Sequence, residues 1–149
     1  MKKPSVTNSK PPDEVTFFID ASLGGKVVAQ ALRDASAKVE IHNDHFAQGT
    51  PDHEWLAAVG DKGWVVLTKD ERIRYHELER LALMDAGVRA FVLTAKGLRG
   101  TENAEILVKA QPSMRRLLKK QAGPFIAKVT RGIEVTLIVS GYKKKRKKK

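Results

Sequence analysis

Cysteine is absent from the 149-residue sequence, which excludes disulfide bonds, thiolate metal sites and cysteine nucleophiles. Aromatic residues make up only 6% of the chain, so extensive stacking on nucleic-acid bases is not indicated. No apolar run approaches the roughly 18 residues that a membrane-spanning helix needs. No apolar stretch follows the basic first residues, so no secretory signal is predicted. These absences favour a cytoplasmic protein without a membrane partner.

Positive charge is in excess, with 28 Lys and Arg against 17 Asp and Glu and a net charge of +11. Seven of the basic residues occupy positions 143–149, so the rest of the chain carries +4, which is eleven less seven. We predict that residues 141–149 form a disordered basic tail, which is either an anchor on a polyanion or a solubilising end. The basic body independently favours a polyanionic partner.

Apolar runs and helical spacing alternate along most of the chain. Residues 1–14 are predicted to be a flexible lead, and residues 15–140 one folded domain. The patterns predict strands at 15–19, 38–41, 64–68 and 88–93, helices at 26–35, 51–60, 75–86, 101–110 and 112–120, and a loop at 42–49. This alternation favours an α/β fold with a mostly parallel central sheet and helices on both faces. Strands at 125–129 and 133–138 predict a C-terminal hairpin.

Two carboxylates follow apolar strands closely. Asp20 comes directly after the first predicted strand, and Asp70 comes two residues after Thr68, where the third strand ends. Parallel strands of one sheet end at the same edge, where α/β folds bind their ligands. The helix predicted after the second strand, with Thr50 as N-cap and Pro51 as its first residue, begins at that edge too. We therefore expect both carboxylates to meet the start of this helix.

Asp52 is the third candidate acid, because it shares a helix face with the apolar stripe of Trp55, Leu56 and Val59. Glu54 lies about 200° around the helix from Asp52 and is expected to point away, which leaves it a possible supporting role.

Further oxygen ligands are available at the same edge. Glu102 or Asn103, at the start of the helix after the fourth strand, could supply a fourth ligand, and Asp44 could support the site. Crowded carboxylates repel each other, and a hard divalent ion such as Mg²⁺ or Mn²⁺ relieves that repulsion. Such an ion activates a bound water for phosphodiester hydrolysis. The four histidines match no zinc pattern.

Each carboxylate also has a local interpretation. Asp20 could cap the turn that follows it, Asp52 is favoured in the first turn of a helix anyway, and Asp70 could pair with Arg72 or Arg74.

Basic residues around the predicted edge suit the backbone of a nucleic acid, although each taken singly is ordinary surface charge. These residues are Lys69, Arg72, Arg74, Lys96 and Arg99.

Three segments resemble PIN-like domains and, more narrowly, the PIN-like toxins of VapBC toxin–antitoxin modules. They are Phe-Phe-Ile-Asp at 17–20, Thr-Pro-Asp-His-Glu-Trp-Leu at 50–56 and Val-Val-Leu-Thr-Lys-Asp-Glu-Arg-Ile-Arg at 65–74. The sequence His-Asn-Asp-His-Phe at 42–46 strengthens the narrower match. The resemblance covers about residues 15–93 well and the remainder loosely.

This resemblance implies a three-layer PIN-like fold and an RNA endonuclease that depends on Mg²⁺ or Mn²⁺. By position, the family's acids fall on Asp20, Asp70 and either Asp52 or Glu54, and Glu102 is a candidate for the fourth. The implied partners are RNA, a cognate antitoxin protein and, as a possibility, a second copy of the chain.

The function predicted from the sequence is therefore a metal-dependent endoribonuclease, the toxin of a toxin–antitoxin pair. The alternative is a non-catalytic nucleic-acid-binding module that acts through its basic surface and tail. A phosphate-accepting receiver domain is disfavoured, because its Asp and Lys are not placed convincingly.

Overall fold

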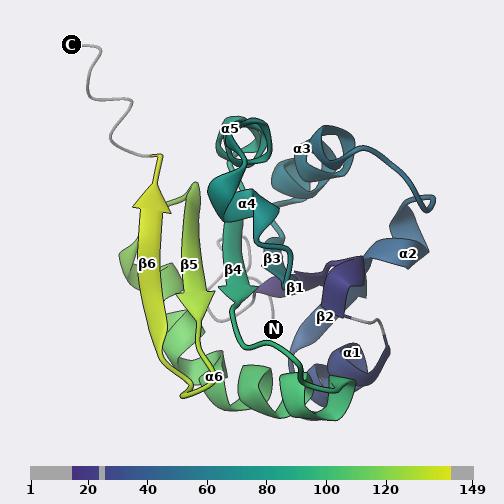
Figure 1. Cartoon of the computed structure of the whole chain (residues 1–149), viewed down its shortest axis with the longest axis vertical. Coiled ribbons are helices and arrows are strands. Elements are labelled where there is room, and N and C mark those ends of the chain that lie inside the picture. Colours follow the sequence, from purple (N-terminus) through teal and green to yellow (C-terminus); the bar gives the residue numbers. More distant parts are fainter. Residues whose placement is uncertain (1–14, 24–25, 142–149) are drawn as a thin grey trace, which may run out of the picture.

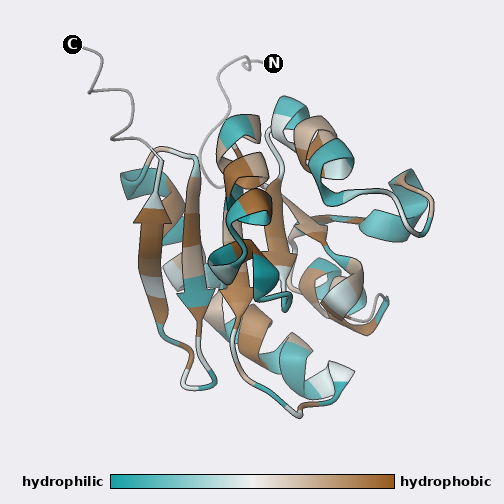
Figure 2. Cartoon of the chain, turned by 45° about the horizontal axis from the view of Figure 1, so that its top comes forward, coloured by the Kyte–Doolittle hydropathy of each residue, from teal (hydrophilic) through white to brown (hydrophobic). Residues whose placement is uncertain are grey.

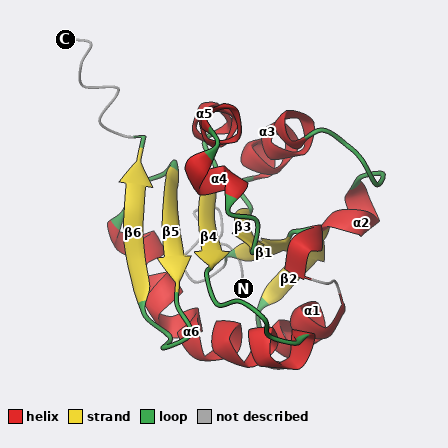
Figure 3. Ribbon diagram, viewed as in Figure 1, coloured by secondary structure: helices red, strands yellow, loops and turns green. Residues whose placement is uncertain are grey.

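The computed structural model describes residues 15–23 and 26–141, which form a sheet between two layers of helices (Figures 1 and 3). The elements follow the order β1 (Thr16–Ile19), η2 (Ala21–Leu23), α1 (Lys26–Asp34), β2 (Lys38–Ile41), α2 (His42–His45), α3 (Asp52–Lys62), β3 (Val65–Thr68), α4 (Arg72–Tyr75), α5 (Glu77–Ala86), β4 (Arg89–Leu93), α6 (Gly100–Lys120), β5 (Phe125–Val129) and β6 (Val135–Ser140). The predicted lead at 1–14 and the basic run at 143–149 lie outside the described residues. Within the described ranges, no helix has both the length and the apolar character needed to cross a membrane.

The six strands form one sheet in the order β2-β1-β3-β4-β5-β6. The first five run parallel, and β6 runs antiparallel to β5 at the edge. Parallel neighbours need crossover connections, which the intervening helices supply. The predicted α/β class, mostly parallel sheet and C-terminal hairpin are confirmed. Because Ile19 pairs with Leu67, the carboxyl ends of β1 and β3 lie side by side.

Alternate side chains of each central strand enter opposite cores, as the pleat requires. In β1, Phe17 belongs to the core under α1 and α6, whereas Phe18 belongs to the core under α3 and α5. Both rings are fully buried, which explains why the strand is a continuous apolar run instead of an alternating one. Figure 2 shows the same arrangement, with hydrophobic strands inside and hydrophilic helix surfaces outside.

Helices α3 and α5 approach closely over the second core. An added Cβ at Gly60 of α3 would lie 2.0 Å from the carbonyl oxygen of Ala86 at the end of α5. A glycine is therefore required for this contact. Helix α5 is capped by Gly87, whose positive φ of 74° is the left-handed conformation that glycine adopts readily.

Helix α6 is continuous, and the predicted break before Pro112 is wrong. Proline removes one backbone donor, but the helix runs through it from Gly100 to Lys120. Leu107, Met114 and Leu118 all face the same core, and their burial on both sides of the proline keeps the helix intact.

Other boundaries also differ from the predictions. The helix predicted at 75–86 is divided by extended His76, and the loop predicted at 42–49 contains the short helix α2. Thr50 does not cap α3, because its hydroxyl donates to the Ala47 carbonyl and Pro51 occupies the cap position. The last strand begins at 135 instead of 133, since Ile133 has a positive φ of 69° and belongs to the turn.

Candidate active site

The site is built at the carboxyl ends of β1 and β3. Strand pairing continues one residue past β1, where the Asp20 N–H donates to the Leu67 carbonyl at 3.0 Å. This places the Asp20 side chain next to Thr68, the last residue of β3. Asp20 and Thr68 thus lie at the sheet edge that the sequence predicted.

A hydrogen-bond network orients the Asp20 carboxylate. Its Oδ2 accepts from the hydroxyls of Ser22 at 2.7 Å and Thr68 at 2.8 Å. The Ser22 hydroxyl also accepts the Lys69 N–H at 2.9 Å, and Thr68 Oγ1 accepts the Asp70 N–H at 2.9 Å. Asp20 and Asp70 are therefore connected through one buried threonine, and the first of them caps its own turn through Ser22.

Sequence reasoning did not select Ser22 or Thr68 as site residues. The available signal is the Thr-x-Asp spacing at 68–70, in which a hydroxyl meets the N–H two residues later. Its contact with Asp20, 48 residues away in the chain, follows only from the pairing of β1 with β3.

Asp70 is held by Arg72. Arg72 Nη2 lies 2.6 Å from Asp70 Oδ2, and its Nε lies 3.0 Å from Oδ1. The Arg72 hydrogen bond, working against partial burial, keeps the pKa of Asp70 below its usual value. Of the two local partners that the sequence left open for Asp70, Arg72 is the one that makes the contact. Arg74 pairs instead with Glu71 at 3.1 Å.

Asp52 is the first residue of α3, and its Oδ1 accepts the indole N–H of buried Trp55 at 3.0 Å. Its charge helps raise the pKa of Arg72, after the larger effect of Asp70. Asp52 therefore acts on the same guanidinium as Asp70. It also lines a cavity of about 420 Å³ between α3 and α5, together with Leu78 and Glu79.

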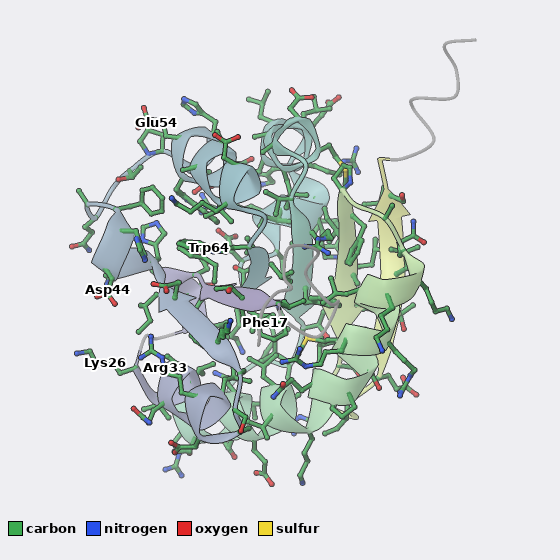
Figure 4. The ribbon with its side chains drawn as sticks, turned by 180° about the vertical axis from the view of Figure 1, so that it is seen from behind. Phe17, Lys26, Arg33, Asp44, Glu54 and Trp64 are labelled. Carbon is green, nitrogen blue, oxygen red and sulfur yellow. The ribbon has the colours of Figure 1, made fainter. Side chains whose placement is uncertain are left out.

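Three other predicted acids lie elsewhere. Glu102 Oε1 accepts the Arg99 N–H at 2.8 Å and so closes the first turn of α6. Asp44 and Glu54 are exposed and point outward in Figure 4. No hydrogen bond or ion pair joins either of them to the described Asp20, Asp52 or Asp70.

The predicted basic residues are placed unequally. Lys69 Nζ donates to the Ala95 carbonyl and to buried Asn103 Oδ1 at 3.3 Å, and burial, followed by the Lys96 charge, lowers the pKa of Lys69. Lys69 thus ties the end of β3 to the loop after β4 and to α6. Lys96 and Arg99 are exposed in that loop.

The donors at this edge fit a hard divalent ion in their chemistry, since they are carboxylate oxygens with neighbouring hydroxyls. Among residues 15–23 and 26–141, no three His, Asp or Glu side chains are grouped closely enough to hold a metal ion. Asp52 and Asp70 contact Trp55 and Arg72 instead.

The fold and this site define an α/β protein with carboxylates at the ends of adjacent parallel strands. Residues 15–95 match the family model described as "PIN like domain", and the chain belongs to that family. A Mycobacterium tuberculosis (strain ATCC 25618 / H37Rv) protein named "Putative ribonuclease VapC45" is 32% identical over 114 residues, covering 74% of this chain and 82% of the relative. No solved structure matches the chain.

Proposed function

We propose that this protein is a metal-dependent RNA endonuclease and the toxin of a toxin–antitoxin pair. The observation that carries the proposal is the connection of Asp20 to Asp70 through Thr68 at the carboxyl ends of β1 and β3. Membership of the PIN-like family and the relative named as a ribonuclease support an RNA substrate.

Asp20, Asp52 and Asp70 are the residues that would hold Mg²⁺ or Mn²⁺. When bound, such an ion supplies an activated water and offsets the charge that develops on the phosphate. Among the described residues, Asp20 Oδ1 has no hydrogen-bond partner, while Ser22 and Thr68 hold Oδ2. The free oxygen supports Asp20 as the principal ligand, and the two hydroxyls fix its orientation.

The exposed cations Lys96 and Arg99 would contact the RNA backbone, because phosphate contacts position a nucleic acid without reading its sequence. Lys69 is anchored to Asn103 and would act from a fixed position at the same edge. Arg72 and Arg74 complete the basic rim that we propose for the substrate.

A cognate antitoxin is the protein partner that we propose, supported by the VapC name of the relative. A homodimer and a cytoplasmic location belong to the same proposal. Size-exclusion chromatography with light scattering, with the antitoxin present or absent, would measure both assemblies.

Cleavage of a panel of defined RNAs tests the proposed reaction. We expect wild-type protein to cleave with Mg²⁺ or Mn²⁺ and to lose cleavage in EDTA. Asp20→Asn and Asp70→Asn should lose most activity, whereas Asp85→Asn, an exposed change on α5, should retain it. RNA binding that weakens with salt, without cleavage by any variant, would support the alternative of a non-catalytic binding module.

A further inference from the structure

Arg72 engages both oxygens of the Asp70 carboxylate. Its Nη2 donates to Oδ2 at 2.6 Å, its Nε lies 3.0 and 3.1 Å from the two oxygens, and its backbone N–H donates to Oδ1 at 3.0 Å. A bidentate arginine–carboxylate pair is among the stronger surface contacts in proteins. The carboxylate proposed for metal binding is therefore already occupied by a cation from its own chain.

The surroundings of Arg72 are negative on more than one side. Asp70 contributes most to raising the pKa of Arg72, and the charges of Asp52 on α3 and Glu79 on α5 act in the same direction. Arg72 consequently balances the charge of two of the three proposed metal ligands, Asp70 by direct contact and Asp52 through its field.

We propose that Arg72 is a built-in competitor for the metal site, which must release Asp70 before a divalent ion can bind there. The proposal rests on the proposed function, because it takes Asp70 as a metal ligand. The physical reason is that a guanidinium and a divalent cation repel each other and use the same carboxylate oxygens.

The position of Arg72 makes this release feasible without disturbing the core. Its side chain is 54% exposed, whereas that of Asp70 is 24% exposed. The guanidinium can turn toward solvent at the loss of a surface ion pair alone. Once released, its planar fork matches a phosphate group, so the same residue would move from Asp70 to the RNA backbone.

A competitor of this kind weakens metal binding in a measurable way. The apparent dissociation constant equals the intrinsic constant divided by the fraction of molecules in which Asp70 is open, so a small open fraction raises it. Removing the guanidinium should therefore tighten binding of Mn²⁺ by up to about fivefold, the upper end of the range for an exposed ion pair. The effect concerns metal binding in the absence of RNA and so is separate from catalysis.

Mn²⁺ titration monitored by electron paramagnetic resonance tests the proposal on the full chain. The variants are Arg72→Gln and Arg74→Gln, which remove the same charge two residues apart, since Arg74 contacts Glu71 and not Asp70. Arg116→Gln on α6 is a second charge control, far from the edge in sequence and exposed. We expect tighter Mn²⁺ binding in Arg72→Gln alone, and no gain from this change in an Asp70→Asn background.

Each outcome decides the proposal. Equal tightening in Arg72→Gln and Arg74→Gln, or none in either, would overturn the competition and leave the ribonuclease assay unaffected. Tightening that persists with Asp70→Asn would overturn it as well. Mn²⁺ binding that appears only after Arg72→Gln supports it. Absence of binding in every variant overturns both the competition and the metal-dependent mechanism, and cleavage in EDTA then decides whether a ribonuclease remains.

Discussion

Thr68 donates its hydroxyl to Asp20 at 2.8 Å across the pair of strands β1 and β3. The same oxygen accepts the backbone N–H of Asp70, so one buried side chain contacts the Asp20 carboxylate and the Asp70 main chain. This relationship organises the candidate active site more directly than any contact between the acids themselves.

Removal of the Thr68 hydroxyl should therefore impair the site. We expect Thr68→Val to reduce RNA cleavage by about ten- to a hundredfold, the range seen when hydrogen-bond partners of metal-ligating groups are lost. The valine keeps the shape of the buried side chain, so the folded structure should persist. Initial cleavage rates and the circular dichroism spectrum would measure the two effects.

Thr68→Ser is the matched control, because it keeps the hydroxyl and removes only a methyl group. Its cleavage rate should stay much nearer to that of the wild type. A Thr68→Val protein that cleaves as fast as the wild type would show that the hydroxyl does not support Asp20.

The contact of Asp70 with Arg72 predicts a dependence of stability on pH. The pKa of Asp70 is lowered in the folded protein, mainly by the Arg72 hydrogen bond. The ionised carboxylate therefore favours the folded state. The stabilisation is present above the unfolded pKa of about 3.9 and is lost as the pH falls through the lower folded pKa. We expect the difference in unfolding free energy between wild type and Asp70→Asn to be constant from about pH 5 to 8 and to shrink below about pH 4.

Urea unfolding across this pH range would measure the difference. Asp85→Asn is the comparison, since Asp85 is exposed on α5. A difference for Asp70→Asn that grows on acidification would contradict the assigned role of Arg72.

The close approach of α3 to α5 predicts that Gly60→Ala destabilises the fold. The new methyl group would meet the Ala86 carbonyl oxygen at 2.0 Å, so the backbones must separate. We expect a loss of about 1–3 kcal/mol in the free energy of unfolding, as for other overpacked contacts. Chemical denaturation monitored by tryptophan fluorescence would measure it.

Gly132→Ala provides a control in the turn between β5 and β6. The nearest atom to its added Cβ is Thr130 Oγ1 at 3.8 Å, an ordinary contact distance. This variant should differ little from the wild type. Equal stability of Gly60→Ala and wild type would mean that the two helices separate without cost.

Much of the fold follows from local pattern. The strands at 38–41 and 125–129 have the predicted bounds, and the helix starting at Lys26 ends within one residue of its prediction. Strand–helix alternation also predicts the parallel sheet, because crossovers leave few other arrangements. The break predicted at Pro112 is wrong. Proline tends to end a helix, but here the burial of Met114 and Leu118 keeps α6 continuous.

The position of the candidate site could be predicted from the sequence, but most of its side-chain contacts could not. Asp20 and Asp70 reach the expected edge because each follows its strand along the chain. Which group each carboxylate contacts depends on side-chain packing between elements, and Ser22 and Thr68 carried too weak a local signal to be selected.

The sequence by itself determined the order of the six strands, the helices on both faces of the sheet and the edge at which Asp20 and Asp70 lie. These features depend on covalent neighbours and on the spacing of apolar residues, which are written in the chain. The tertiary structure decided that Thr68 connects the Asp20 carboxylate to the Asp70 backbone N–H and that Arg72 occupies the Asp70 carboxylate. Such contacts need atoms brought together from separate elements, or one rotamer chosen among several, and only the packed fold makes that choice.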